Sequence, residues 1–242
     1  MLKDWQDACG HGMYDHLKGK DGCEIAERDD GFVEASGGPK CYFSKYDEWP
    51  QIEKQAMSYV AGKVLDIGCG AGRHSLHLQE RGFDVVCIDT SPLAIEVCKS
   101  RGLRQAHVLS ITQITSKLGL YDTLLMLGNN FGLLGNFKRA KWLLRRFRRI
   151  TSEKGRIVAE TLDPYDTKVP EHLEYHEFNR NRGRMPGEAR LRIRYKKYVT
   201  PWFDYLFVSK KEMKRILEDT GWEARDFIDG EGPTYIAIIG KE

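Results

Sequence analysis

The chain alternates short apolar runs with longer segments in which apolar residues recur every three or four positions. The runs predict buried strands, and the longer spacing predicts amphipathic helices. From residue 63 the two patterns follow one another in turn, which is typical of a parallel sheet with right-handed helical crossovers. Strands are predicted at 63–67, 83–88, 105–109, 122–127 and 155–161, and helices at 73–81, from Pro92 to Gly102, and at 136–150.

The pattern changes towards both ends of the chain. Before residue 60, turn signals around Gly31 and Gly38 flank one short predicted strand, and a helix is predicted at 51–60. Residues 163–187 are predicted to be an irregular insertion, because Pro164, Pro170 and Pro186 act as breakers. The predicted C-terminal part is a strand at 191–196, a break at 200–204, a helix capped by Ser209, and a hairpin of strands 222–228 and 234–239.

A glycine-rich turn follows the first predicted strand, in the run V-L-D-I-G-C-G-A-G-R at 64–73. A strand, a glycine turn and a helix in this order let polar groups of a ligand approach the backbone and the helix N-terminus. The second predicted strand ends in Asp89, 21 residues after Gly68. A carboxylate at that place is suited to hold the hydroxyls of a ribose.

The G-x-G-x-G run, the preceding Asp66 and the following Asp89 together resemble motifs of the class I S-adenosylmethionine-dependent methyltransferases. The resemblance covers residues 62–150 well and the C-terminal part loosely. It implies a three-layer Rossmann-like α/β sandwich, whose mostly parallel seven-stranded sheet ends in a C-terminal antiparallel hairpin. It also implies an N-terminal lid at 1–60 and a methyltransferase domain at 61–242, with an insertion at about 163–200.

The same resemblance implies a site for S-adenosylmethionine, with S-adenosylhomocysteine as the product. In related enzymes the first acid lies under the methionine amine, the glycine N–H groups approach the carboxylate and sugar, and the second acid binds the ribose. Many relatives place an acid after the third strand where this chain has Ser110, which is equally suited to a plain turn. Cys69 lies within the turn, where its thiol either approaches the ligand or only fills space, and space filling is favoured. The expected cofactor-binding residues are Asp66, Gly68, Cys69, Gly70, Gly72, Asp89, Thr90, Ser110, Ile111 and Leu127.

Catalytic candidates follow the fourth and fifth strands, because ligands of open α/β sheets bind at the carboxyl ends of strands. Asn129, in L-G-N-N-F-G, is suited to position an acceptor amine or contact the cofactor, and the alternative is a turn-forming role. Glu160 and His176 are candidates to take the acceptor's proton. The Pro-Pro-aromatic sequence of DNA adenine methyltransferases is absent here, which argues against that subclass.

Charge and cysteine content change this interpretation little. The net charge of the 242 residues is +3, but 138–149 carries seven Lys or Arg residues and 180–197 carries eight. Such basic runs either attract nucleic acid or form solvated helix faces, and solvated faces are favoured here. Six cysteines without a C-x-x-C pair favour reduced thiols over disulfides or zinc, and no metal is expected. Without an apolar span or signal segment, we expect a cytoplasmic protein with no membrane partner, a monomer or a homodimer.

The sequence therefore predicts an S-adenosylmethionine-dependent methyltransferase that transfers methyl groups directly to a nitrogen or oxygen of a small molecule. The 1–60 segment and the insertion are the parts available to form an acceptor pocket. Two alternatives stay open: an RNA or protein methyltransferase that uses the basic surface, and a non-catalytic scaffold that only binds the cofactor.

Overall fold

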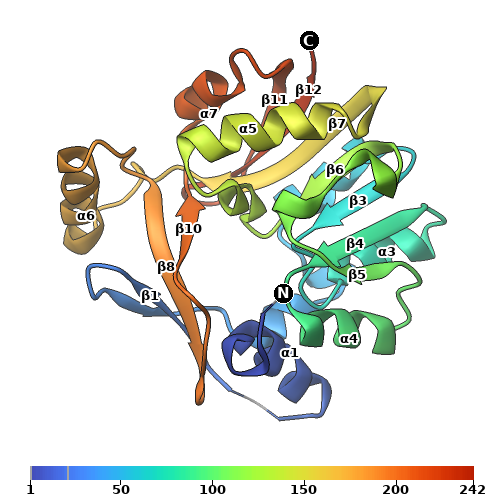
Figure 1. Cartoon of the computed structure of the whole chain (residues 1–242), viewed down its shortest axis with the longest axis horizontal. Helices are drawn as coiled ribbons and strands as arrows, with labels where there is room; N and C mark the ends of the chain where they lie inside the picture. Colours follow the sequence, from blue (N-terminus) through green and yellow to red (C-terminus); the bar gives the residue numbers. More distant parts are fainter. Residues whose placement is uncertain (1, 21) are drawn as a thin grey trace. The chain divides into compact units, whose positions relative to one another are not determined.

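The computed structural model describes residues 2–20 and 22–242, which fold as an α/β protein around a seven-stranded mixed sheet (Figure 1). The order across this sheet is β11 (Trp222–Asp229), β12 (Thr234–Lys241), β7 (Thr151–Leu162), β6 (Tyr121–Met126), β3 (Val64–Ile67), β4 (Val85–Asp89) and β5 (Ala106–Val108). β4 is parallel to β5 and β6 to β7, whereas β12 is antiparallel to both β7 and β11. The predicted Rossmann-like sheet with a closing antiparallel hairpin is confirmed.

The predicted helices of this region are present, and side-chain caps mark where the last three begin. They are α3 (Arg73–Glu80), α4 (Pro92–Ser100), α5 (Phe137–Arg148) and α7 (Lys210–Leu217). Ser91 Oγ accepts a hydrogen bond from Ala94 N at 2.9 Å, and Asn136 Oδ1 accepts one from Arg139 N at 3.0 Å. Each cap pairs a backbone donor that the first helical turn leaves without a partner.

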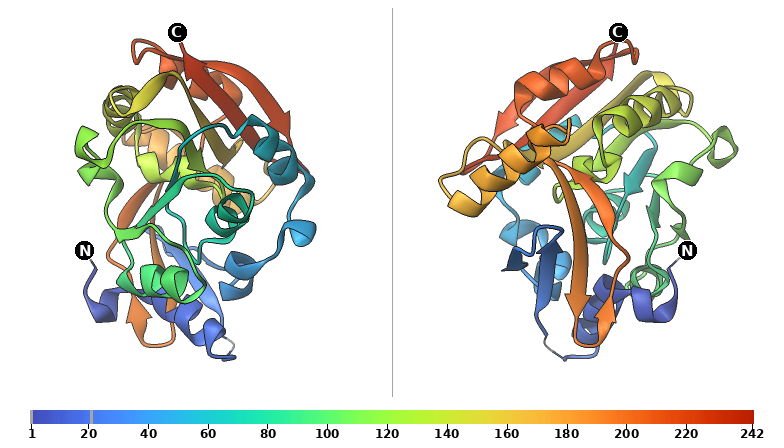
Figure 2. Two further views of the ribbon diagram at one scale, coloured as in Figure 1. Left: turned by 90° about the vertical axis from the view of Figure 1, so that its right-hand side faces the viewer. Right: turned by 60° about the vertical axis from the view of Figure 1, so that its left-hand side comes forward.

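The chain divides into two compact units. The first comprises 1–49, 65–114 and 190–203, and the second comprises 50–64, 115–189 and 204–242. In the first unit, α1 (Ala8–Leu17) packs along α4 (Figures 1 and 2). In the second, α5 packs on β7 and α7 on β11, while α2 (Gln51–Ala56) packs on β11 and β12. Each unit thus has its own buried apolar core.

Short 3₁₀ helices occupy several connections. They are η1 (Asp4–Gln6), η2 (Pro39–Phe43), η3 (Tyr46–Glu48), η4 (Met57–Tyr59), η5 (Ile111–Gln113), η6 (Ser116–Leu118) and η7 (Asn130–Leu134). The predicted helix 51–60 is therefore a short α-helix that continues as a 3₁₀ turn. Across residues 2–20 and 22–242, every helix is too short or too polar to cross a membrane.

The expectation that 163–187 is irregular is wrong, because the segment contains α6 (Pro170–Asn181). Pro170, taken as a breaker, occupies the first turn of this helix, where its missing N–H costs nothing and its fixed φ favours the helical conformation. Glu171 in the same turn adds a favourable interaction with the helix dipole.

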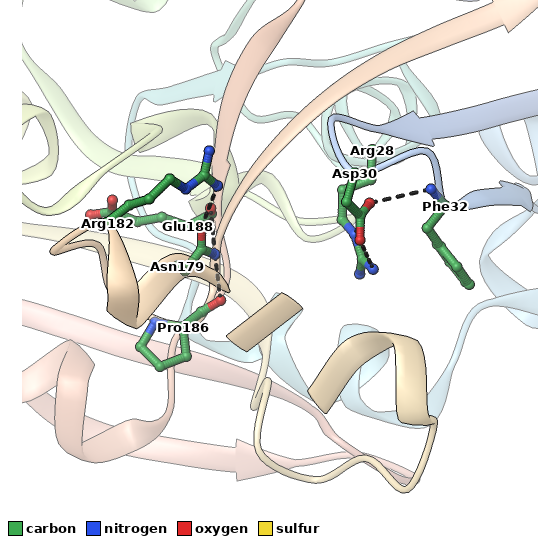
Figure 3. A network of polar contacts seen from close by, with 7 residues as sticks. All are labelled: Arg28, Asp30, Phe32, Asn179, Arg182, Pro186 and Glu188. Atoms are coloured by element: carbon green, nitrogen blue, oxygen red, sulfur yellow. Dashed lines mark hydrogen bonds and ion pairs between the residues drawn. The ribbon is translucent and has the colours of Figure 1, made fainter. Parts of the chain in front are cut away.

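A second, smaller sheet was not predicted. Its strands are β1 (Glu24–Arg28), β2 (Val33–Ala35), β8 (Glu188–Tyr195), β9 (Tyr198–Val199) and β10 (Phe203–Leu206). β2 and β8 match the predicted short strands, but β1 was missed. The expected break at 200–204 is present but shorter, because residues 200–202 lie outside the strands and β10 begins at Phe203, two residues after Pro201. The turn between β1 and β2 is held by Asp30, which accepts two hydrogen bonds from the Arg28 guanidinium at 2.9 and 2.7 Å (Figure 3).

Asn179 fixes the turn between α6 and β8. Its side chain is fully buried, and its amide group donates to the carbonyls of Pro186 at 2.9 Å and Glu188 at 3.0 Å (Figure 3). Its Oδ1 accepts from Arg182 at 2.9 Å.

We expect Asn179→Ala to lower the free energy of unfolding by about 2–4 kcal/mol, since two backbone carbonyls lose a buried donor. Urea unfolding followed by far-UV circular dichroism measures the change. Asn181→Ala, at an exposed position of the same helix, is the control and should stay within about 0.5 kcal/mol of the wild type. Equal unfolding curves for the two variants would contradict the anchoring role.

Candidate functional site

The glycine turn between β3 and α3 has the conformation that its sequence predicts. Gly68, Gly70 and Gly72 all adopt positive φ, at 76°, 54° and 78°, a region that only glycine enters readily. A Cβ on Gly72 would lie 2.4 Å from the side chain of Leu103. A side chain is therefore excluded at Gly72. The N–H groups of Gly68 and Gly72 donate to the carbonyls of Ile88 at 2.9 Å and Cys69 at 2.8 Å, so the turn is held in this conformation by its own backbone.

Asp89 lies at the end of β4 and is bound to this turn. Its carboxylate accepts hydrogen bonds from Gly70 N at 3.1 Å and from Ser91 N at 2.9 Å. Burial raises the pKa of the carboxyl to about 6. The structure thus brings together the glycine turn and the acid that was predicted from their spacing.

Asp66, in β3, is buried, and its carboxylate accepts a hydrogen bond from Ser75 Oγ of α3 at 2.7 Å. Burial raises its pKa to about 7. This contact ties the strand to the helix across the glycine turn. Its predicted role beneath the methionine amine of the cofactor stays a prediction.

The other predicted residues of the first unit surround the same strand ends. Cys69 lies in the turn, Thr90 is exposed directly after β4, and Ile111 is buried in η5. Ser110 Oγ accepts from Thr112 N at 3.3 Å and so begins this 3₁₀ turn. Ser110 therefore has the turn role that the sequence left open, and contact with adenine stays a prediction.

The N-terminal segment packs directly against the glycine turn, within the same unit. A Cβ placed on Gly70 would lie 3.5 Å from the Tyr42 ring and 3.7 Å from the sulfur of Met13. Asp7 holds the start of α1 to α4, because its carboxylate accepts from Gly10 N at 3.1 Å and from Leu93 N at 3.2 Å.

The aromatic residues of this segment pack in two places. Tyr42 lies at the glycine turn, whereas Tyr46 stacks on His77 with ring centroids 4.3 Å apart, and Trp49 packs on His74 at 4.6 Å. The two histidines of α3 are thus packed against aromatic rings.

Glu24 is the functional candidate that the sequence did not reveal. It lies in β1 and is 1% exposed, and its Oε2 accepts hydrogen bonds from Tyr42 Oη at 3.1 Å and Ser36 Oγ at 3.3 Å. Its other oxygen, Oε1, is buried and has no hydrogen-bond partner in the described part of the chain. Burial raises the pKa of this carboxyl to about 7. A buried oxygen of this kind is costly unless a ligand pairs it.

No pattern in the sequence pointed to Glu24. Its neighbour Ile25 is 39% exposed, so the strand turns its acid inward and its apolar residue outward, opposite to what alternation predicts.

The predicted catalytic residues lie in the second unit, together with Leu127. Asn129 follows β6 in a left-handed conformation, with its Oδ1 buried and without a partner in the described chain. Its backbone carbonyl accepts from Tyr205 Oη at 2.6 Å. Glu160 Oε2 accepts from Gly128 N at 2.8 Å, so it holds the loop that carries Asn129.

His176 is buried on α6, with its ring 5.8 Å from that of Tyr165. The same unit contains a cavity of about 390 Å³ at the start of α5, and no predicted site residue lines it. The catalytic roles of Asn129, Glu160 and His176 stay predictions.

Comparisons with known proteins agree with this geometry. Residues 64–155 match the family described as "Methyltransferase domain". A crystal structure of an S-adenosylmethionine-dependent methyltransferase from Bacteroides fragilis, in complex with S-adenosyl-L-homocysteine, is 25% identical with a TM-score of 0.85. That likeness covers 100% of this chain and 97% of the other. The chain is a class I S-adenosylmethionine-dependent methyltransferase.

Two relatives of this methyltransferase are named for their substrates. A glycine/sarcosine N-methyltransferase from Halorhodospira halochloris is 25% identical over 215 residues, covering 75% of this chain and 76% of the relative. A glycine/sarcosine/dimethylglycine N-methyltransferase from Actinopolyspora halophila is 25% identical over 187 residues, which are 71% of this chain but 33% of that protein.

The first unit of the methyltransferase carries several acidic side chains near the glycine turn. Asp7, Glu24, Asp66 and Asp89 are carboxylates that lie around the glycine turn, and the first three are at most 2% exposed. A ligand with positive charge favours their ionised forms and offsets the cost of burying them. S-adenosylmethionine carries a sulfonium and an ammonium group, so its charge complements this part of the fold.

Proposed function

We propose that this methyltransferase transfers the methyl group to the nitrogen of a small amine. The observation that carries the proposal is a buried carboxylate oxygen without a partner in the described residues, Glu24 Oε1. A carboxylate oxygen is a hydrogen-bond acceptor, so it matches a ligand that donates an N–H group. The relatives named glycine/sarcosine N-methyltransferases also support an amine acceptor.

For methyl transfer to an amine, the protein must mainly position the acceptor and accept its proton. When bound, S-adenosylmethionine supplies a methyl group that is already electrophilic. An ammonium acceptor must lose a proton before its nitrogen can attack. Glu24, with a pKa of about 7, is matched to accept that proton near neutral pH. Tyr42 positions the carboxylate through its hydrogen bond to Oε2.

Matched amines and alcohols test the proposal. The enzyme is incubated with S-adenosylmethionine and either glycine, sarcosine and other small primary and secondary amines, or the hydroxyl analogues such as glycolate. We expect release of S-adenosylhomocysteine, with a methylated product by mass spectrometry, from at least one amine and not from its hydroxyl analogue. An ammonium group can donate an N–H to Glu24 Oε1 and give it a proton, whereas a hydroxyl group has no comparably acidic proton.

Three results would overturn the proposal. The first is turnover of glycolate or another alcohol without turnover of amines. The second is methylation of mixed RNA or protein at low salt while the amines stay unmodified, which would support use of the basic surface. The third is cofactor binding by calorimetry with no turnover on any acceptor, which would support the scaffold alternative.

A further inference from the structure

Three thiols from distant parts of the sequence converge beside the glycine turn. Cys69 lies within the turn, Cys87 in β4 and Cys98 on α4, all in the first unit. Their sulfur atoms lie within 4.8 Å of one another, and the Cys69 and Cys98 sulfurs are 3.8 Å apart. Cys87 and Cys98 are fully buried, whereas Cys69 is partly exposed.

These separations match the geometry of a metal–thiolate centre. Metal–thiolate bonds are about 2.3 Å long, so three sulfurs in a trigonal planar arrangement around one ion lie about 4 Å apart. A small adjustment of side chains is therefore enough to bring all three sulfurs into contact with one ion. The partly exposed Cys69 gives the ion a route to the two buried thiols.

The ligand set discriminates between metals. In residues 2–20 and 22–242, no histidine, aspartate, glutamate or fourth cysteine joins the three sulfurs. Structural zinc sites almost always have four protein ligands. Soft thiolate ligands select Cu(I) among the other common ions, and Cu(I) accepts low coordination numbers. Three buried thiols without hard oxygen or nitrogen ligands therefore favour Cu(I) over Zn²⁺.

We propose that Cys69, Cys87 and Cys98 form a three-thiol binding site for Cu(I). Each thiol that coordinates the ion releases its proton to solvent, so binding is accompanied by proton release. Cys98 also gives up the hydrogen bond that its thiol donates to the carbonyl of Gly70 at 3.2 Å. Because Gly70 belongs to the cofactor turn, the metal site and the cofactor site share one backbone segment.

The spacing of the cysteines in the sequence did not indicate this site. We expected no metal because the sequence has no C-x-x-C pair. That pattern describes ligands that share one local turn. Here the ligands come from a turn, a strand and a helix, and only the β–α–β fold of this region brings them together.

Anaerobic titration of the full-length, reduced protein with Cu(I) tests the proposal, with a bathocuproine chelator as the competing colorimetric probe. We expect the wild type to retain one equivalent of Cu(I). Cys87→Ala and Cys98→Ala should each bind it more than about 100-fold less tightly, since the loss of an outer-shell partner alone costs about 10- to 100-fold. Cys23→Ser, at an exposed thiol outside the cluster, is the control and should bind as the wild type does.

A thermal shift on addition of S-adenosylmethionine verifies that each variant is folded. Equal copper affinity in the wild type, Cys87→Ala and Cys98→Ala would overturn the proposal, because exposed thiols would then hold the ion. Stoichiometric binding of Zn²⁺ in preference to Cu(I) would also overturn it. X-ray absorption of the loaded wild type gives a direct readout, for which we expect sulfur neighbours only.

Discussion

Glu24→Gln is expected to lower kcat for amine methylation by about 10²-fold or more, the contribution typical of a general base. Glutamine keeps the volume of the side chain and its hydrogen bond from Tyr42, but it cannot take a proton. Cofactor affinity should be unchanged if Glu24 serves the acceptor. Steady-state kinetics and calorimetry with S-adenosylmethionine measure the two quantities separately.

The pH dependence of kcat/KM gives a second readout of Glu24. The carboxylate must be ionised to accept a proton, so in the wild type kcat/KM rises with pH through a pKa of about 7. Glu24→Gln should abolish this acidic limb. Tyr42→Phe removes a hydrogen bond that favours the ionised form, so the limb should move to higher pH.

The control for Glu24 is Glu34→Gln, at an exposed acid on the neighbouring strand β2, and its kinetics should match the wild type. One outcome would reassign Glu24. If Glu24→Gln weakens S-adenosylmethionine binding and leaves kcat unchanged, then the carboxylate binds the cofactor's ammonium group instead of the acceptor. In that case the amine panel stands as an independent test of the proposed function.

Asp89→Ala is expected to weaken cofactor binding by about 1.5–3 kcal/mol, the range for hydrogen bonds to a charged group, or about 10- to 150-fold in Kd. Isothermal calorimetry measures the loss. The fold-loss should be the same for S-adenosylmethionine and S-adenosylhomocysteine, because both carry the same ribose. Asp84→Ala, at an exposed acid just before β4, is the control and should bind as the wild type does.

Two results for Asp89 would contradict its predicted role. An unchanged affinity would remove it from the site. A loss confined to the positively charged S-adenosylmethionine would show that the carboxylate acts through its charge and not through the ribose hydroxyls.

The sheet was predictable because its strands are buried, and burial leaves apolar runs that a single sequence displays. The glycine turn was predictable for a related reason, since Gly68, Gly70 and Gly72 have conformations that other residues avoid. Asp89 followed from distance along the chain, because one β–α–β unit has a nearly fixed length. Local rules decide each of these features.

The features that were missed depend on contacts between distant segments. β1 was missed because it pairs with β8, so that Glu24 lies opposite Tyr195 from a distant part of the chain. A proline such as Pro170 can either interrupt a helix or begin one, and the local sequence does not distinguish the two. In the structure it begins α6. No spacing rule links Cys69 with Cys98, since the fold of the first unit alone makes them neighbours.

The buried carboxyl groups around the glycine turn have a consequence for the lifetime of the protein in a cell. The folded-state pKa values of Glu24, Asp66 and Asp89 lie above those of the unfolded chain, so the ligand-free fold binds extra protons and loses stability as pH rises from about 4 to 7. At neutral pH the empty enzyme is therefore the form most open to proteolysis, and the loaded enzyme is protected. The amount of enzyme should thus follow the supply of methyl donor.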